Sequence, residues 1–95
     1  MSTTQKIENR LLATHISENK DFETACLTGN VEKIMYIVNS EIEKNNLQTK
    51  GSEKLKNDIF RLTKGQSKVS ATIGQNILMF VWNSRLSGTG LKVMA

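Results

Sequence analysis

The sequence predicts an all-α fold: a compact bundle of four to five short helices, ending in a hydrophobic C-terminal helix. Three observations favour this class. The 95 residues include no proline, which would interrupt helices. Five of the six glycines fall where a helix is expected to stop. Apolar residues recur at helical spacing, most clearly at Val31, Ile34, Val38 and Ile42. The chain is too short for two separate cores, so residues 1–95 are expected to form one helical domain.

The N-terminal half is expected to contain three helices. The first covers about residues 4–19, with its apolar residues spread over roughly half of the helix circumference. Asp21 is expected to cap a short helix over 22–28, which Gly29 ends. Asn30 is expected to cap a helix from 31 to about 45 with one narrow apolar stripe. Tyr36 and Ile37 lie outside that stripe, which indicates a second contact surface.

A polar stretch, EKNNLQTKGS, is expected to form the longest loop. After it, Ser52 is expected to cap a fourth helix that ends near Lys64, with its apolar residues on one face. Basic side chains gather on the other side and continue past the helix end. We call this set the basic stripe; its members are Lys50, Lys54, Lys56, Arg61, Lys64 and Lys68.

The last expected helix begins at Ser67 or Ser70 and continues to about Leu86. It contains six consecutive apolar residues, 77–82, so it is apolar around most of its circumference. Such a helix is either central in a bundle or partly covered by another subunit, and we expect both. Met79, Trp82 and Leu86 are expected to face outward.

The alternative is an α+β fold, in which residues 77–82 form a strand that pairs with LKVMA in a C-terminal β-hairpin. Against it, the helical spacing extends from Ile73 to Leu86, and an isolated two-stranded ribbon has little stability. With a helix, Gly88 is expected to end it, and a hinge at Gly90 would let the last apolar residues fold back.

Composition indicates a cytoplasmic protein that does not enter membranes. Cys26 is the only cysteine, so no disulfide can form within the chain. The first residues carry charges and lack the apolar segment of a secretory signal. The longest apolar run has six residues, against the roughly twenty that span a bilayer.

No pattern of catalytic or metal-binding residues is visible. His15 is the only imidazole, and neither it nor Cys26 has the partners that a nucleophile and its base require. One histidine and one cysteine do not make a usual zinc site. Glu41 and Glu43 are two residues apart, so they diverge on a helix and are expected to be solvated. SGTGLK lacks the glycine spacing of a phosphate-binding loop. We therefore expect no enzyme activity, no cofactor and no metal.

Two known patterns share the segment ACLTGNVEKIMYIVN. It resembles the helix-loop-helix part of a single ankyrin repeat, with small residues, a Gly-Asn turn and an apolar helix. No second copy occurs, and a repeat unit cannot bury its face alone, so the resemblance implies only a tight helical hairpin. The segment also fits part of a helix-turn-helix motif, but Thr24 replaces an apolar residue and the second helix carries three glutamates that would repel phosphate.

Charge is distributed unevenly within a net charge of +4: residues 1–46 carry −2 and residues 47–95 carry +6. This segregation suggests either an anionic partner or reciprocal contacts between two copies. We expect a non-enzymatic binding or regulatory protein that docks on an unidentified protein and associates with itself, most simply as a dimer. By analogy only, accessory and inhibitor proteins of phages or mobile elements have this size and composition. The candidate interface residues are Tyr36, Ile37, Met79, Trp82 and Leu86. The alternative is a regulator whose basic stripe binds DNA or RNA.

Overall fold

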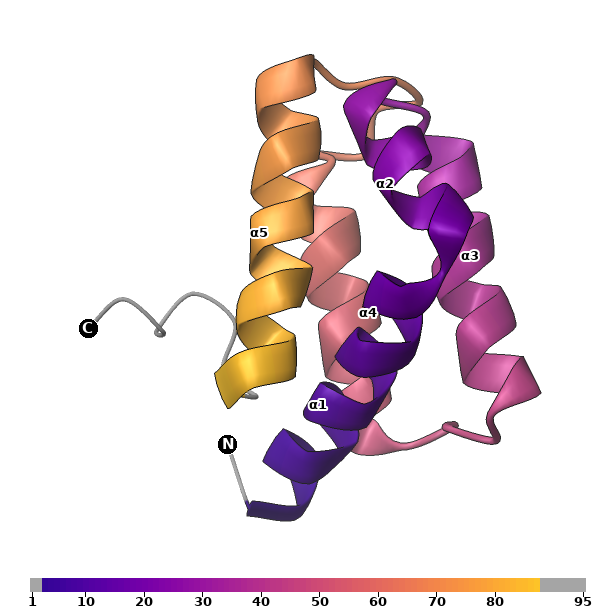
Figure 1. The fold of residues 1–95 in the computed structure, drawn as a ribbon, viewed down its shortest axis with the longest axis vertical. Coiled ribbons are helices and arrows are strands. Elements are labelled where there is room, and N and C mark those ends of the chain that lie inside the picture. The colour runs from indigo at the N-terminus through magenta and orange to yellow at the C-terminus, as the bar shows by residue number, and fades with distance from the viewer. Residues whose placement is uncertain (1–2, 88–95) are drawn as a thin grey trace.

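The computed structural model describes residues 3–87, which fold into five helices around one core (Figure 1). The helices are α1 (Thr3–Glu18), α2 (Lys20–Leu27), α3 (Val31–Lys44), α4 (Lys50–Leu62) and α5 (Ala71–Ser87). The all-α prediction is confirmed. Residues 77–82 lie within α5, so the first strand of the alternative hairpin does not form. Gly88, Gly90 and the second strand proposed for that hairpin lie outside the described residues.

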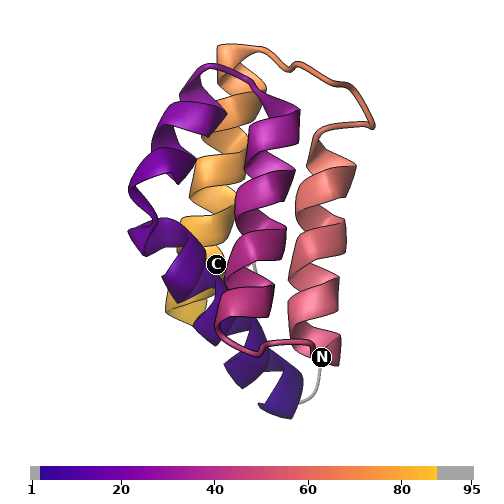
Figure 2. The same cartoon turned by 90° about the vertical axis from the view of Figure 1, so that its right-hand side faces the viewer.

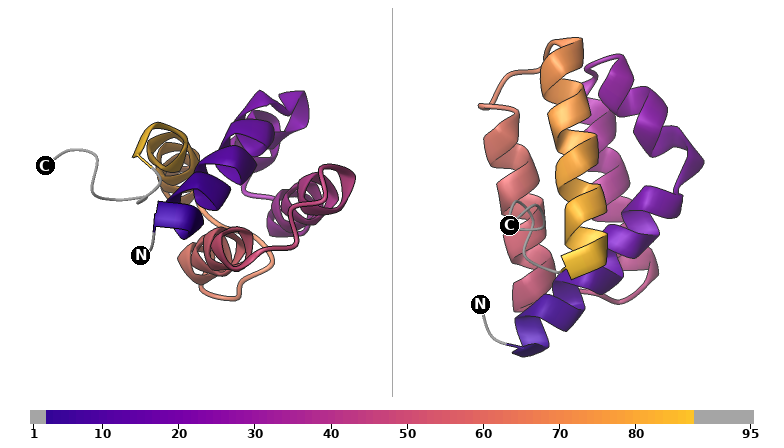
Figure 3. Two further views of the ribbon diagram at one scale, coloured as in Figure 1. Left: turned by 90° about the horizontal axis from the view of Figure 1, so that it is seen from below. Right: turned by 60° about the vertical axis from the view of Figure 1, so that its left-hand side comes forward.

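The helix α1 packs against all four other helices, and among these the neighbouring pairs are α2 with α3, α3 with α4, α4 with α5, and α5 with α2. Figure 2 shows α3, α4 and α5 roughly parallel, with α1 crossing them at an angle. The most extensive packing of α1 is with α5 and α4. The helices α3 and α5 are not adjacent, because α1 and α2 lie between them (Figure 3, left).

Capping residues set the helix starts, in two cases two or three residues before the expected residue. Asn30 caps α3 as predicted, because its side chain accepts a hydrogen bond from the Lys33 backbone N–H at 3.1 Å. The predicted cap at Asp21 is wrong, since Asn19 accepts from the Asp21 N–H and α2 begins before it. Likewise Thr49, not Ser52, caps α4. In both places an earlier residue of capping type was present in the sequence.

Gly29 ends α2 as predicted, with a positive φ of 69°. Gly51 does not end a helix, which corrects the expectation for it; it lies in the first turn of α4, and Gly74 lies in the first turn of α5, within the helix expected there. Both are points of close backbone approach. A Cβ on Gly51 would lie 2.6 Å from the Cβ of Glu8, and one on Gly74 would lie 2.8 Å from the carbonyl carbon of Cys26. Glycine here lets α4 and α5 approach their neighbours closely.

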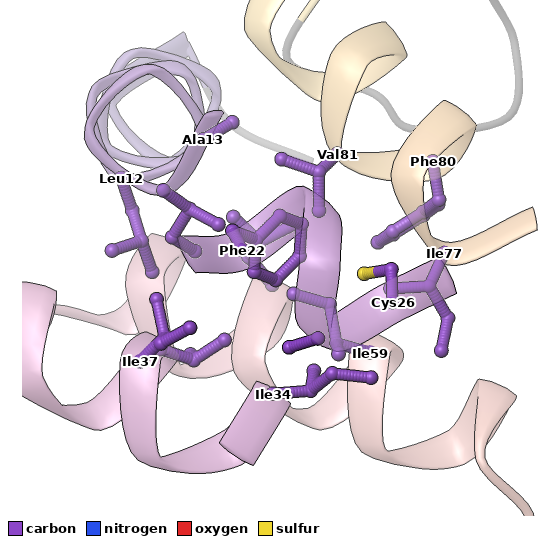
Figure 4. Packing of buried hydrophobic residues seen from close by; sticks show 14 of the residues in the cluster. Leu12, Ala13, Phe22, Cys26, Ile34, Ile37, Ile59, Ile77, Phe80 and Val81 are labelled. Atoms are coloured by element: carbon purple, nitrogen blue, oxygen red, sulfur yellow. The ribbon is translucent and has the colours of Figure 1, made fainter. Parts of the chain in front are cut away.

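The core is an apolar cluster from all five helices (Figure 4). Ile77 and Val81 of α5 lie inside it, as predicted. Ile37 does too, with 3% of its surface exposed, so its assignment to an interface is wrong. The reason is that α3 contacts α1, α2 and α4 and buries a wider face than its narrow apolar stripe indicated.

Glu41 is also buried, with 5% exposed, although we expected it in solvent. Its carboxylate accepts hydrogen bonds from the side-chain amides of Asn19 at 2.9 Å and Asn45 at 3.0 Å, and lies 3.5 Å from Lys44 Nζ. Burial by itself would raise the pKa of Glu41, but these hydrogen bonds and the lysine charge outweigh it and lower the pKa. Glu41 therefore joins the start of α2 to the end of α3.

A candidate docking surface on α1 and α5

The outward face of α5 carries three large apolar side chains. Met79, Trp82 and Leu86 are 60%, 52% and 56% exposed. Their spacing of three and four residues places them on one side of the helix, opposite Ile77 and the rest of the buried face. The prediction that these three residues face outward is confirmed. α5 is therefore apolar on its solvent side as well as on its core side.

The neighbouring helix α1 also exposes apolar side chains beside α5. Ile7 and Leu11, one turn apart, are 53% and 47% exposed. Together with Arg85 of α5 they line a hollow of about 190 Å³ between the two helices. We call the five residues Ile7, Leu11, Met79, Trp82 and Leu86 the α1–α5 surface, and Figure 3 (right) shows these two helices on the same side of the bundle.

Sequence reasoning did not select Ile7 and Leu11. The available signal was that apolar residues cover half of the circumference of α1, more than a helix needs when only one face is buried. The structure buries Leu12, Ala13 and Ile16 and leaves the remaining part of that apolar arc in solvent.

Arg85 lies beside Trp82 at the seam between α1 and α5. One of its nitrogens, Nη1, donates to Ser17 Oγ at 2.9 Å, and Nη2 lies 3.5 Å from a carboxylate oxygen of Glu18. The guanidinium also lies 5.2 Å from the centre of the Trp82 ring. Trp82 further lines a second hollow of about 190 Å³ with Leu78 and Glu23.

Tyr36 is 65% exposed, as the prediction required, but it is not part of this surface. It belongs to α3, which is not adjacent to α5, and its ring lies 5.8 Å from Lys33 Nζ on the same helix. The predicted interface residues are therefore divided among the core, the exposed face of α3 and the α1–α5 surface.

The basic stripe lies on the solvent side of α4 and the loop after it, as predicted, but much of its charge is locally paired. Asp58 lies 3.1 Å from Lys54 and 3.5 Å from Arg61, and Glu53 lies 3.9 Å from Lys56. The remaining three lysines, Lys50, Lys64 and Lys68, are exposed. Lys50, Lys54 and Arg61 help to line an open hollow of about 630 Å³.

The other titratable groups do not assemble into a reactive site. Burial, and then the negative charge of Glu23, raise the pKa of the Cys26 thiol to about 12, so the thiolate is strongly disfavoured at neutral pH. Within residues 3–87, no three His, Cys, Asp or Glu side chains are grouped closely enough to hold a metal ion. In the same part of the chain no helix has both the length and the apolar character needed to cross a membrane.

No protein-family model matches this chain, and neither a curated protein nor a solved structure shows significant similarity to it.

Proposed function

We propose that this chain is a non-enzymatic binding protein that acts by docking on other protein surfaces and by self-association, and that the α1–α5 surface is its contact site. One observation carries the proposal. Three large apolar side chains on one face of α5 are each more than half exposed, while the opposite face of the same helix fills the core. Contiguous exposed apolar patches mark interaction sites, and Trp and Met are enriched at protein interfaces.

The arrangement of Trp82 supports this role. Arg85 lies against its ring and is itself fixed by Ser17 and Glu18 of α1. A side chain that is held before binding loses less conformational freedom when a partner covers it. Trp and Arg are also the residue types that most often contribute strongly to binding. We expect Trp82 to be the central contact of the interface.

A cytoplasmic location is part of the proposal. Cys26 is a free, buried thiol, and such a chain needs no oxidising compartment to fold.

The test is the mass of the protein in solution, measured by light scattering over a range of concentrations. We expect the wild type to exceed the monomer mass of 10.7 kDa and the Trp82→Glu variant to be a monomer with an unchanged helical circular dichroism spectrum. The matched control is Phe60→Glu, which changes an equally exposed aromatic residue on α4 and should associate like the wild type. A Trp82→Glu chain that associates normally, or that simply unfolds, would contradict the proposed surface.

Nucleic-acid binding through the basic stripe is a second candidate function. It is favoured by the grouping of Lys50, Lys54 and Arg61 around one open hollow. It is weakened by Asp58, which neutralises part of that charge. If it holds, binding to DNA or RNA falls steeply with added salt, and changing Lys54, Arg61 and Lys64 together to Glu abolishes it. Absence of binding even at low salt would exclude this function.

A further inference from the structure

We infer that the occupant of the α1–α5 surface is a second copy of this chain, related by a two-fold axis, with Arg10 of each copy opposite Glu23 of the other. The inference rests on the proposed function and specifies the partner and its orientation. It is carried by two charges beside α5: Arg10 of α1 lies at one end of the seam between α1 and α5, and Glu23 of α2 lies where that seam continues between α2 and α5.

The seam has a basic end and an acidic end. Arg10 lines the first hollow, beside Ile7 and Leu11, and Glu23 lines the second, beside Trp82. Within residues 3–87 neither Arg10 nor Glu23 forms an ion pair. Two further charged residues of the seam, Arg85 and Glu18, are already paired with each other. Two opposite charges thus remain available at opposite ends of an apolar surface.

These positions determine which arrangement of two copies fits. Arg10 Nε lies 3.4 Å from the carbonyl oxygen of Arg85, while Glu23 shares its hollow with Leu78. Residues 78 and 85 are about 10 Å apart along α5, at roughly 1.5 Å per residue. Their midpoint falls next to Trp82. A two-fold axis near Trp82 therefore exchanges the basic and acidic ends and forms both Arg10–Glu23 contacts at once.

The opposite, parallel arrangement would bring like charges together at both ends, which is unfavourable. The two-fold arrangement also places the two Trp82 side chains near the axis, where each would lose its contact with solvent. Aromatic residues at the centre of an interface, surrounded by polar contacts that exclude water, are typical of strong binding sites.

A dimer interface must take in residues around the α1–α5 surface as well. α1 and α5 have 16 and 17 residues, and from helix length and diameter the face they share measures at most roughly 25 by 20 Å, or about 500 Å² in projection. A standard interface buries about 800 Å² on each partner, from a chain that exposes 5751 Å² in total. A 95-residue chain also gains more from sharing apolar surface than a large one does.

The experiment reverses the two charges singly and together: Arg10→Glu, Glu23→Arg, and the double variant. Dimerisation is followed by light scattering and by the fluorescence of Trp82, which is the only tryptophan in the chain. We expect wild-type emission to shift to the blue as concentration rises. Each single reversal should raise the dimer dissociation constant about tenfold or more, because symmetry places two like-charged contacts in the dimer. The double variant should return to within a few-fold of the wild type.

The matched control is Glu32→Arg, which reverses an exposed acidic residue of α3 and should leave the dissociation constant unchanged. If either reversal reduces the helical circular dichroism signal, Arg10→Gln and Glu23→Gln replace it. Their effects on dimerisation should then be non-additive in the double variant.

Two results would overturn the inference in different ways. In the first, the wild type dimerises, but the double variant raises the dimer dissociation constant by the two single effects combined. This result would exclude the two-fold orientation and leave the docking surface in place. A wild-type monomer whose Trp82 emission does not change on dilution would exclude self-association through this surface altogether.

Discussion

Replacing Gly74 by alanine tests the close packing between α2 and α5. Gly74 lies in the first turn of α5, where that turn meets the backbone of Cys26 at the end of α2. A Cβ at position 74 would lie 2.8 Å from the Cys26 carbonyl carbon and closer still to its oxygen. Both are backbone atoms, so no side-chain rotation relieves the overlap, and α5 must move away from α2.

Two effects of opposite sign determine the result. Alanine is favoured over glycine within a helix by about 1 kcal/mol. Overpacking of a core typically costs about 1 to 3 kcal/mol, and a backbone-to-backbone clash belongs at or above the upper end of that range. We therefore expect Gly74→Ala to lower the free energy of unfolding by about 2 kcal/mol. For a domain of this size the midpoint of thermal unfolding should fall by about 10 °C.

Thermal and urea unfolding followed by far-ultraviolet circular dichroism measure this change. The control is Gln75→Ala, which alters the next residue, exposed in the same helical turn, and should leave the midpoint nearly unchanged. Helix propensity alone predicts that Gly74→Ala is stabilising. A variant as stable as the wild type, or more so, would therefore refute the claim that close approach requires glycine at this position.

Three further predictions concern single side chains. Folding lowers the pKa of Glu41. The contribution of its carboxylate to the free energy of unfolding is therefore complete above the ordinary pKa of 4.5 and is lost as pH falls through the lowered pKa. The free energy of unfolding of the wild type should thus exceed that of Glu41→Gln by about 1 to 3 kcal/mol at pH 7. Urea titrations at lower pH should show this difference becoming smaller. The Cys26 thiol should react with a thiol-specific reagent only after urea unfolding; rapid reaction in buffer would contradict its burial. Asn30→Ala removes the cap of α3 and should lower the free energy of unfolding by about 1 kcal/mol, measured by the same urea titration. An unchanged free energy of unfolding would contradict the capping role.

The sequence allowed the helices to be predicted because their signals are local. The apolar spacing of α3 and its cap at Asn30 depend on residues within one helix turn of each other. The predicted start of a helix differs from the observed one where two capping residues lie close together, as Thr49 and Ser52 do. Which of the two residues caps α4 depends on how α4 packs against α1. A local sequence pattern does not contain that packing.

The surface was only partly predictable, because burial depends on how many neighbours a helix has. Met79, Trp82 and Leu86 were identified correctly as outward-facing, since α5 is apolar on more sides than one monomer could cover. Ile37 was assigned wrongly because α3 packs against three helices. Likewise the burial of Glu41 requires Asn19, which is 22 residues away in the sequence.

The outer side of α4 differs from that of α5, so the exposed apolar face of α5 is not a consequence of the fold. Both helices pack on α1 and both have one side in solvent. The solvent side of α4 carries lysine, arginine and acidic residues that pair with each other, with Phe60 as the one large apolar exception. On α5 the charged residue of the described chain, Arg85, turns toward α1 and leaves Met79, Trp82 and Leu86 in solvent. Since the bundle accommodates a polar outer helix at α4, it does not require the apolar outer face of α5, and this supports the proposed docking surface.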